Sequence, residues 1–161
     1  MKTYRNEEHG FEIDIPNDWS PYDYSLPVIP SLLFAIVHGW APKVDGAFTC
    51  SYKEILNIVV ESMMPEPSPE LTESFFLKYA RSLNLADVHI GRITILDREH
   101  TWAIYNFENK VWSKKYMIVL AGTGYAITVC CDDQQLFSQR EEVWDTIVET
   151  FRLLEPSDNS M

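Results

Sequence analysis

The chain has 161 residues, with 13 basic and 24 acidic side chains that give a formal net charge of −11. This length suits a single domain, residues 1–161, that can bury an ordinary core. The excess of negative charge argues against binding to the phosphate backbone of nucleic acid. No apolar stretch approaches the ~18 residues of a membrane-spanning helix, so we expect no membrane span.

The cysteines indicate a reducing compartment. Cys50 stands alone and Cys130 is followed directly by Cys131, and three cysteines cannot all pair within one chain. The first ten residues run into polar and acidic side chains instead of the apolar segment of a signal peptide. We therefore expect free thiols and a cytoplasmic location.

The first third of the chain predicts strands. Residues 11–15 alternate apolar and acidic side chains, which is typical of a half-buried strand, and residues 2–5 supply its hairpin partner. Pro16 lacks an N–H and ends this strand, and we expect Trp19 to fold back onto the core. Residues 31–37 and 54–63 predict two further strands, the first of them apolar on both faces.

A proline-rich segment then predicts the start of a helix. Ser68 can accept hydrogen bonds as the N-cap, Pro69 suits the first helical position, and Glu70 complements the helix dipole. The spacing of the apolar residues predicts a single buried face. That face comprises Leu71, Phe75, Tyr79 and Leu83, with Phe76 and Ala80 beside them.

Four strands are predicted next, over residues 88–96, 101–108, 111–120 and 125–131. The parity of apolar residues changes at Gly91, which predicts a β-bulge there. The last two strands are joined by a glycine-containing hairpin loop.

The C-terminal part predicts a long amphipathic helix that begins near Asp132 or Asp133, with a polar tail from about residue 155. Asp132 and Gln135 suit a capping box. The inward side is predicted to comprise Phe137, Arg140, Trp144, Ile147, Val148 and Phe151. The outward side is predicted to comprise Glu141, Glu142, Asp145 and Glu149.

The order of hairpin, strands, helix, four-stranded meander and long helix resembles the PsbP-like superfamily, over about residues 4–154. Phe11, Pro16 and Trp19 match its opening pattern, and Phe151 matches a closing aromatic residue. The superfamily includes the photosystem protein PsbP, a nuclear import factor that binds the GTPase Ran, and bacterial DcrB-type proteins. The resemblance implies an α+β fold in which helices sandwich an antiparallel sheet of about six or seven strands, usually without catalysis. It carries over no functional residue.

The residues themselves indicate no catalytic, cofactor or metal site. The chain has neither a nucleophile elbow nor a phosphate-binding loop, and its four histidines have no metal-ligand spacing. Cys130 to Asp133 could hold a divalent metal, but the side chains of adjacent strand residues diverge. Packing by the cysteines and capping by the aspartates is therefore the favoured interpretation.

Two surfaces are candidates for binding a partner. The first is a proline-broken loop that either covers the core or forms an apolar patch, which comprises Tyr22, Tyr24, Leu26, Val28 and Ile29, joined by Trp40. The second is the acidic outer face of the last helix, at Glu141, Glu142, Asp145 and Glu149, which is either a solvated surface or a docking patch for a basic partner.

Three functions remain open at this point. We favour a noncatalytic protein-binding module, such as a cytoplasmic adaptor, assembly factor or chaperone-like domain, whose protein partner is unknown. The alternative is a small-ligand or lipid binder with an aromatic cavity between sheet and helix. An enzyme of unrecognised type is the third. A homodimer is favoured because an edge strand and an aromatic loop are available, although the oligomeric state stays open.

Overall fold

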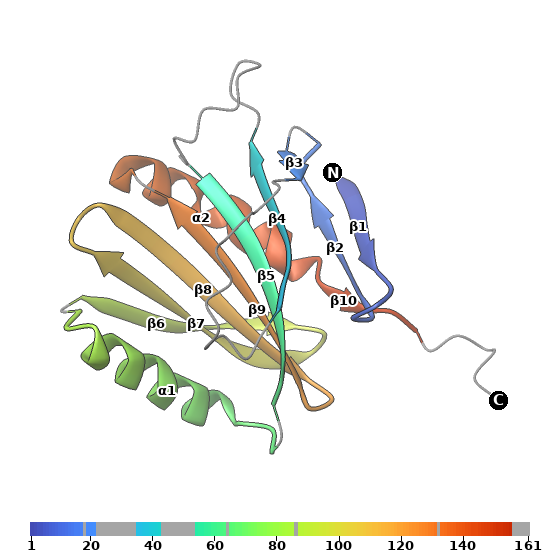
Figure 1. Ribbon diagram of the computed structural model, residues 1–161, viewed down its shortest axis with the longest axis horizontal. Helices are drawn as coiled ribbons and strands as arrows, with labels where there is room; N and C mark the ends of the chain where they lie inside the picture. The colour runs from blue at the N-terminus through green and yellow to red at the C-terminus, as the bar shows by residue number, and fades with distance from the viewer. Residues whose placement is uncertain are drawn as a thin grey trace.

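The computed structural model describes residues 1–17, 19–21, 35–42, 54–63, 65–85, 87–131 and 133–155. Within them, seven strands form one antiparallel sheet in the order β3-β4-β5-β9-β8-β7-β6 (Figure 1). These strands are β3 (Trp19–Pro21), β4 (Ala35–Pro42), β5 (Glu54–Ser62), β6 (Val88–Ile95), β7 (Arg98–Phe107), β8 (Val111–Leu120) and β9 (Thr123–Cys131). The predicted antiparallel sheet is confirmed. Of the apolar residues 31–37, only 35–37 lie within the described part, at the start of β4.

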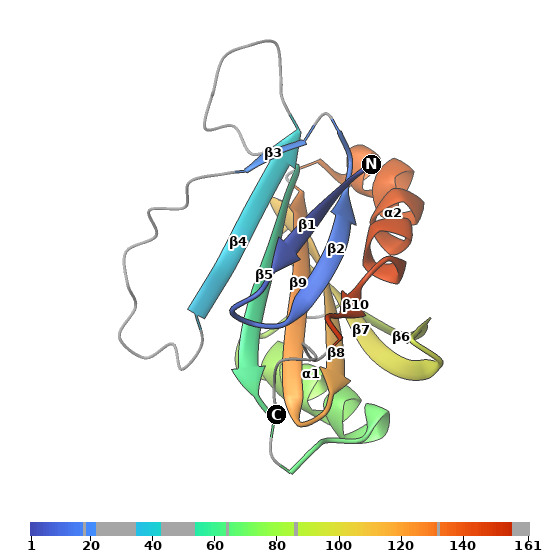
Figure 2. The same cartoon turned by 90° about the vertical axis from the view of Figure 1, so that its right-hand side faces the viewer.

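A second, smaller sheet was not predicted. The opening hairpin, β1 (Lys2–Asn6) and β2 (Phe11–Ile15), pairs with the short strand β10 (Arg152–Leu153) that follows the last helix. Figure 2 shows these strands beside α2 (Gln134–Glu149). The first and last described segments of the chain therefore pair with each other.

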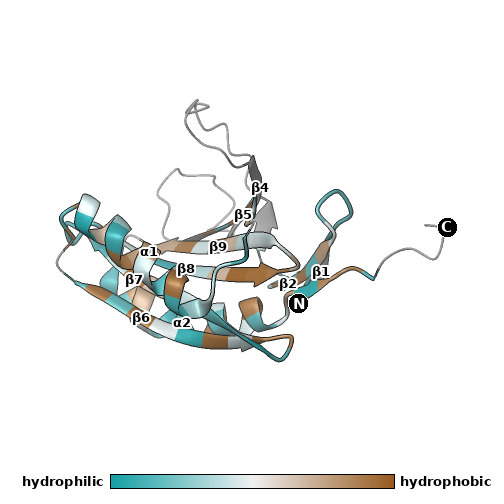
Figure 3. Ribbon diagram, turned by 90° about the horizontal axis from the view of Figure 1, so that it is seen from below, coloured by the Kyte–Doolittle hydropathy of each residue, from teal (hydrophilic) through white to brown (hydrophobic). Residues whose placement is uncertain are grey.

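The two helices cover opposite faces of the main sheet. Adjacent strand residues point to opposite faces. Ile118 packs in the core cluster that contains the inner side of α2, whereas Met117 packs in a separate cluster with α1 (Pro69–Ser82). Figure 3 shows the curved layer of strands from below. The predicted sandwich of helices around a sheet is confirmed, and neither helix is long and apolar enough to cross a bilayer.

The larger core lies on the α2 face. Phe11 of β2 packs against Tyr125 of β9 and against Phe151, with ring centroids 5.7 Å and 5.5 Å away, and these two rings also contact each other at 4.9 Å. Trp144 is completely buried, and Trp19 is buried as expected from its place after the first hairpin. An apolar residue of the alternating strand β2, near the start of the chain, therefore packs against Phe151, which follows the last helix.

Local sequence signals explain where the helices begin. Ser68 Oγ accepts a hydrogen bond from the N–H of Leu71, and Pro69 occupies the first turn, as predicted. Asp133 caps α2 by accepting from the N–H groups of Gln135 and Leu136. Asp132, which was predicted to form a capping box with Gln135, lies outside the described residues.

The predicted bulge at Gly91 is wrong. Gly91 pairs with Trp102 in an unbroken β6–β7 register. A Cβ atom at Gly91 would lie 2.2 Å from the indole ring of Trp102. The glycine therefore makes room for an aromatic ring on the α2 face and does not interrupt the strand.

Candidate functional site

The exposed part of α1 is the clearest departure from the predicted core. The helix buries Thr72, Phe76 and Ala80 against the sheet, so only part of the predicted apolar face is covered. Phe75 is 52% exposed and Tyr79 is 50% exposed. Leu71 and Leu83, which were predicted to be buried as well, are also exposed. The apolar residues of α1 span a wider arc than the sheet covers, because the helix packs mainly on the edge pair β6 and β7.

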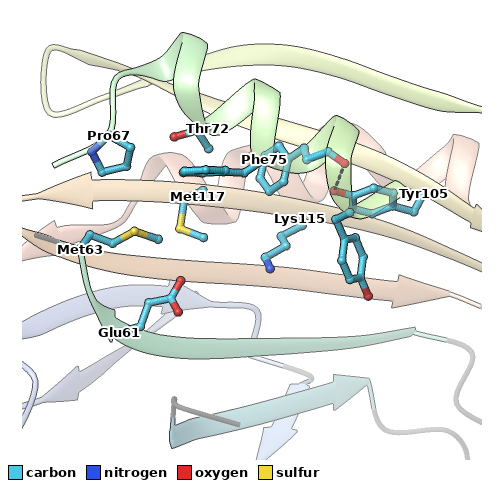
Figure 4. Close-up of a pocket in the computed structure, with 10 residues that line it drawn as sticks. Glu61, Met63, Pro67, Thr72, Phe75, Tyr105, Lys115 and Met117 are labelled. Atoms are coloured by element: carbon cyan, nitrogen blue, oxygen red, sulfur yellow. Dashed lines mark hydrogen bonds between the residues drawn. The ribbon is translucent and has the colours of Figure 1, made fainter. Parts of the chain in front are cut away.

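A groove of about 220 Å³ lies between the exposed side of α1 and the sheet. We call it the α1 groove, and it is lined by Glu61, Met63, Pro67, Thr72, Phe75, Phe76, Tyr79, Tyr105, Lys115 and Met117. Figure 4 shows Phe75 on the helix above Met117 and Lys115, with Glu61 on the other side. The groove thus has aromatic walls and two charged side chains.

The aromatic side of the groove is held in place by packing. Tyr105 on β7 donates a hydrogen bond from its hydroxyl to the carbonyl oxygen of Phe76, at 3.5 Å. Its ring packs edge-on against those of Tyr79 and Phe76. Burial raises the pKa of Tyr105 far above its ordinary value, so its hydroxyl stays protonated at neutral pH.

A second hollow, of about 290 Å³, adjoins the groove near the start of α1. It shares Pro67, Thr72 and Met117 with the groove and extends to Arg98 and His100. The groove surface therefore continues around the first turn of the helix.

Two consecutive lysines on β8 serve different faces of the sheet. Lys114 points to the α2 face and Lys115 to the α1 groove, because strand side chains alternate. Sequence analysis identified neither residue. The signal was present, since Ser113 and the two lysines interrupt an otherwise apolar strand between Trp112 and Tyr116.

Lys114 is 1% exposed and is held by the predicted outer face of α2. Its ammonium group lies 2.8 Å from Glu141 Oε1, 2.9 Å from Asp145 Oδ1 and 4.2 Å from the centroid of the Trp102 ring. The hydroxyl of Tyr116 also donates to Asp145. Desolvation and this carboxylate raise the pKa of Tyr116.

The acidic face of α2 is therefore divided between two roles. Glu141 and Asp145 were expected to point outward, but they bind a buried cation and fix the helix to the sheet. Glu142 and Glu149 are exposed, as predicted. A docking role for this face remains a prediction, and it rests on fewer free carboxylates than the sequence indicated.

The apolar loop predicted as a partner surface lies outside the described residues. It comprises Tyr22, Tyr24, Leu26, Val28 and Ile29. Trp40 belongs to β4, where it pairs with Leu56 in the ladder.

The adjacent cysteines diverge as expected from strand geometry. Cys131 is buried in the α2-side core, and Cys130, on the other face, contacts Ser113 Oγ through its thiol at 3.8 Å. Burial raises the pKa of the Cys130 thiol, which is the opposite of what activates a nucleophile.

Among the histidines in the described ranges, His100 has the most distinctive surroundings. It is 4% exposed, and its Nδ1 accepts a hydrogen bond from the N–H of Val119 at 3.2 Å. Desolvation lowers the pKa of His100, so the ring is neutral at pH 7. Its position close to a turn had suggested an ordinary surface or structural histidine, and the structure shows the structural kind.

Comparisons with known proteins identify the fold. No protein-family model and no curated protein matches the sequence. The solved structures that match include cyanobacterial PsbP (CyanoP) from Synechocystis sp. PCC 6803, with a TM-score of 0.63 and 11% identity, over 94% of this chain and 91% of that one. They also include the Ran-binding protein Mog1p of Saccharomyces cerevisiae, with a TM-score of 0.61 and 10% identity, over 96% and 95% of the two chains.

A third match is a protein of unknown function from Pseudomonas aeruginosa, described as a putative regulator. It has a TM-score of 0.53 and 15% identity, and the match covers 98% of this chain and 99% of that one. At these identities the likeness concerns the fold alone. The chain therefore has the PsbP-like fold that the order of its elements predicted.

Proposed function

We propose that this chain is a noncatalytic protein-binding module. Its partner surface is the α1 groove together with the exposed aromatic row beside it, which comprises Phe75 and Tyr79. The observation that carries this proposal is the exposure of Phe75 and Tyr79, half of each side chain, on a helix that has already buried a different stripe. Neighbouring exposed apolar side chains beside a hollow mark protein interaction surfaces. Aromatic residues are also enriched in such interfaces.

The chemistry of the described residues supports binding more than catalysis. The buried charge cluster around Lys114 is satisfied by its own ion pairs and packs α2 against the sheet. Cys130 is kept protonated by burial, and no base is placed beside it among the contacts that the structure describes. The similarity in fold to Mog1p, which is a Ran-binding protein, is compatible with this proposal.

The predicted alternative, a small-ligand or lipid binder, has one observation in its favour. The α1 groove is an aromatic-lined space between sheet and helix, as that alternative requires. Its volume of about 220 Å³ lies below the roughly 300–1,000 Å³ of pockets that enclose drug-sized ligands. A space of this size suits one or two side chains of a partner better than a whole lipid.

The test is affinity capture from the native host with purified protein and two variants. Phe75→Glu places a charge in the exposed aromatic row, whereas Leu77→Glu makes the same kind of change at an exposed apolar residue of α1 that does not line the groove. We expect the unchanged protein and Leu77→Glu to capture the same partner and Phe75→Glu to lose it.

Circular dichroism and urea unfolding should show that both variants fold. Equal capture by Phe75→Glu and Leu77→Glu would contradict the proposed surface. Absence of any specific protein, at low and at moderate salt, would contradict the protein-binding function itself. The cytoplasmic location remains a prediction, and the partner is still to be identified. Capture from fractionated cells tests the location and identifies the partner.

A further inference from the structure

Glu61 and Lys115 are the two charged side chains of the α1 groove. They do not form a close ion pair of the kind that Lys114 makes on the other face of the sheet. Lys114 makes two ion pairs below 3 Å and contacts an aromatic ring. Lys115, one residue later, is paired through its backbone with β7 and β9, but its ammonium group makes no hydrogen bond or ion pair within 4 Å to any residue that the structure describes. Glu61 acts on it electrostatically across the groove but does not form a direct pair.

Lys115 is half-buried because its stem crosses the floor of the groove between β7 and β9. Desolvation lowers the pKa of its ammonium group, and the charge of Glu61, which lines the same groove, offsets only part of that effect. A half-buried cation with no close anion has lost hydration without gaining a partner. An anion placed in the groove would therefore gain a charge-assisted hydrogen bond from Lys115.

The walls of the groove determine what must accompany that anion. Phe75 and Met117 present apolar surface on two sides of the space that Lys115 enters (Figure 4). A small inorganic anion would leave this surface in contact with water. An apolar side chain next to a carboxylate would cover the surface and pair with the ammonium group at once.

We propose that the segment of the partner protein that binds in the α1 groove carries an apolar side chain beside an Asp or Glu residue, whose carboxylate pairs with Lys115. This proposal rests on the proposed function, because it names the chemistry of the partner of that site. The net charge of −11 does not oppose it at close range, because charges beyond about 8 Å are screened at physiological ionic strength.

The test is selection of linear peptides from a displayed random library against the full chain. Parallel selections use Lys115→Met, which keeps the apolar stem and removes the charge. The matched control is Lys110→Met, the same change at an exposed lysine of the β7–β8 turn. We expect the unchanged protein and Lys110→Met to enrich peptides with an aromatic or branched apolar residue beside Asp or Glu, and Lys115→Met to lose this preference.

A titration of the best peptide and its Asn or Gln counterpart makes the test quantitative. We expect about a tenfold weaker Kd for the uncharged peptide on the unchanged protein, as is typical of one charge-assisted hydrogen bond. The two peptides should bind Lys115→Met equally. Enrichment of basic or uncharged peptides, enrichment that ignores Lys115→Met, or no enrichment would each overturn the proposal.

The outcome is separable from that of the proposed function. If Phe75→Glu loses the native partner while Lys115→Met retains it with unchanged affinity, the surface is right and the acidic partner segment is wrong. Light scattering tests whether a second copy of this chain binds in the groove instead of another protein. A mass of two chains that falls to one with Phe75→Glu would show a second copy in the groove and would also overturn the proposal.

Discussion

Lys114 Nζ on β8 lies 2.8 Å from Glu141 Oε1 on α2, so the sheet and its covering helix are joined by a buried cation. The lysine is almost wholly buried, whereas Glu141 and Asp145 keep about a third of their side-chain surface in water. This asymmetry determines which partner is costly to remove, since a buried charge left unpaired cannot be rehydrated.

Removing the cation should cost less than removing both anions. Lys114→Met is expected to lower the free energy of unfolding by about 2 kcal/mol, because the two carboxylates it releases can turn to water. The double variant Glu141→Gln with Asp145→Asn should cost about 4 kcal/mol, because Lys114 stays buried without an anion. Urea unfolding measures both, and Lys110→Met at an exposed position serves as the control. The reverse order of the two losses would contradict this view of the cluster.

Gly91 should not tolerate a side chain while Trp102 is present. Gly91→Ala places a methyl group 2.2 Å from the indole ring, which must shift away from its place over Lys114. We expect the free energy of unfolding to fall by about 1–3 kcal/mol, as is typical of overpacking. Adding Gly91→Ala to Trp102→Leu should cost much less. Equal costs in both backgrounds would show that the two residues do not interact.

The buried His100 should make stability depend on pH. The unfolded chain takes up this proton near pH 6.5, whereas the pKa of the folded ring is lower. The contribution to the free energy of unfolding is therefore fully present above that pH and is lost as the pH falls below it. His100→Gln should reduce the loss of stability seen by urea unfolding between about pH 7.5 and pH 5.5. A dependence of stability on pH that is the same for His100→Gln as for the unchanged protein would contradict the prediction.

Arg152 and Asp14 should control stability in acid. Hydrogen bonds from Thr3 and Arg152 lower the pKa of Asp14 below its ordinary value of 3.8. Because the folded pKa is the lower one, the stabilising contribution is present above the unfolded value and is lost as the pH falls through the folded value. Asp14→Asn should therefore lose less stability than the unchanged protein on acidification below about pH 4. Thermal unfolding at several acidic pH values measures this, and parallel curves for the two proteins would argue against it.

Much of the architecture could be predicted because it depends on local signals. The alternation at Phe11, Ile13 and Ile15 predicts a strand with one buried side, whichever sheet it joins. Ser68 followed by Pro69 predicts a helix start from the chemistry of its first turn. These features involve residues close together in the chain, and the structure confirms them.

The sequence alone determined the order and type of the two helices and the longer strands, because backbone periodicity follows from residues a few positions apart, but it did not reveal the short strands β3 and β10. Only the tertiary structure decided which stripe of α1 is covered and which lysine of β8 has a counter-ion. Phe75 and Phe76, adjacent in the chain, project from different sides of α1, and the packing of that helix on β6 and β7 buries Phe76 and leaves Phe75 exposed. The surroundings of Lys114 and Lys115 differ because α2 places two carboxylates over one face of the sheet, whereas α1 leaves a groove on the other face.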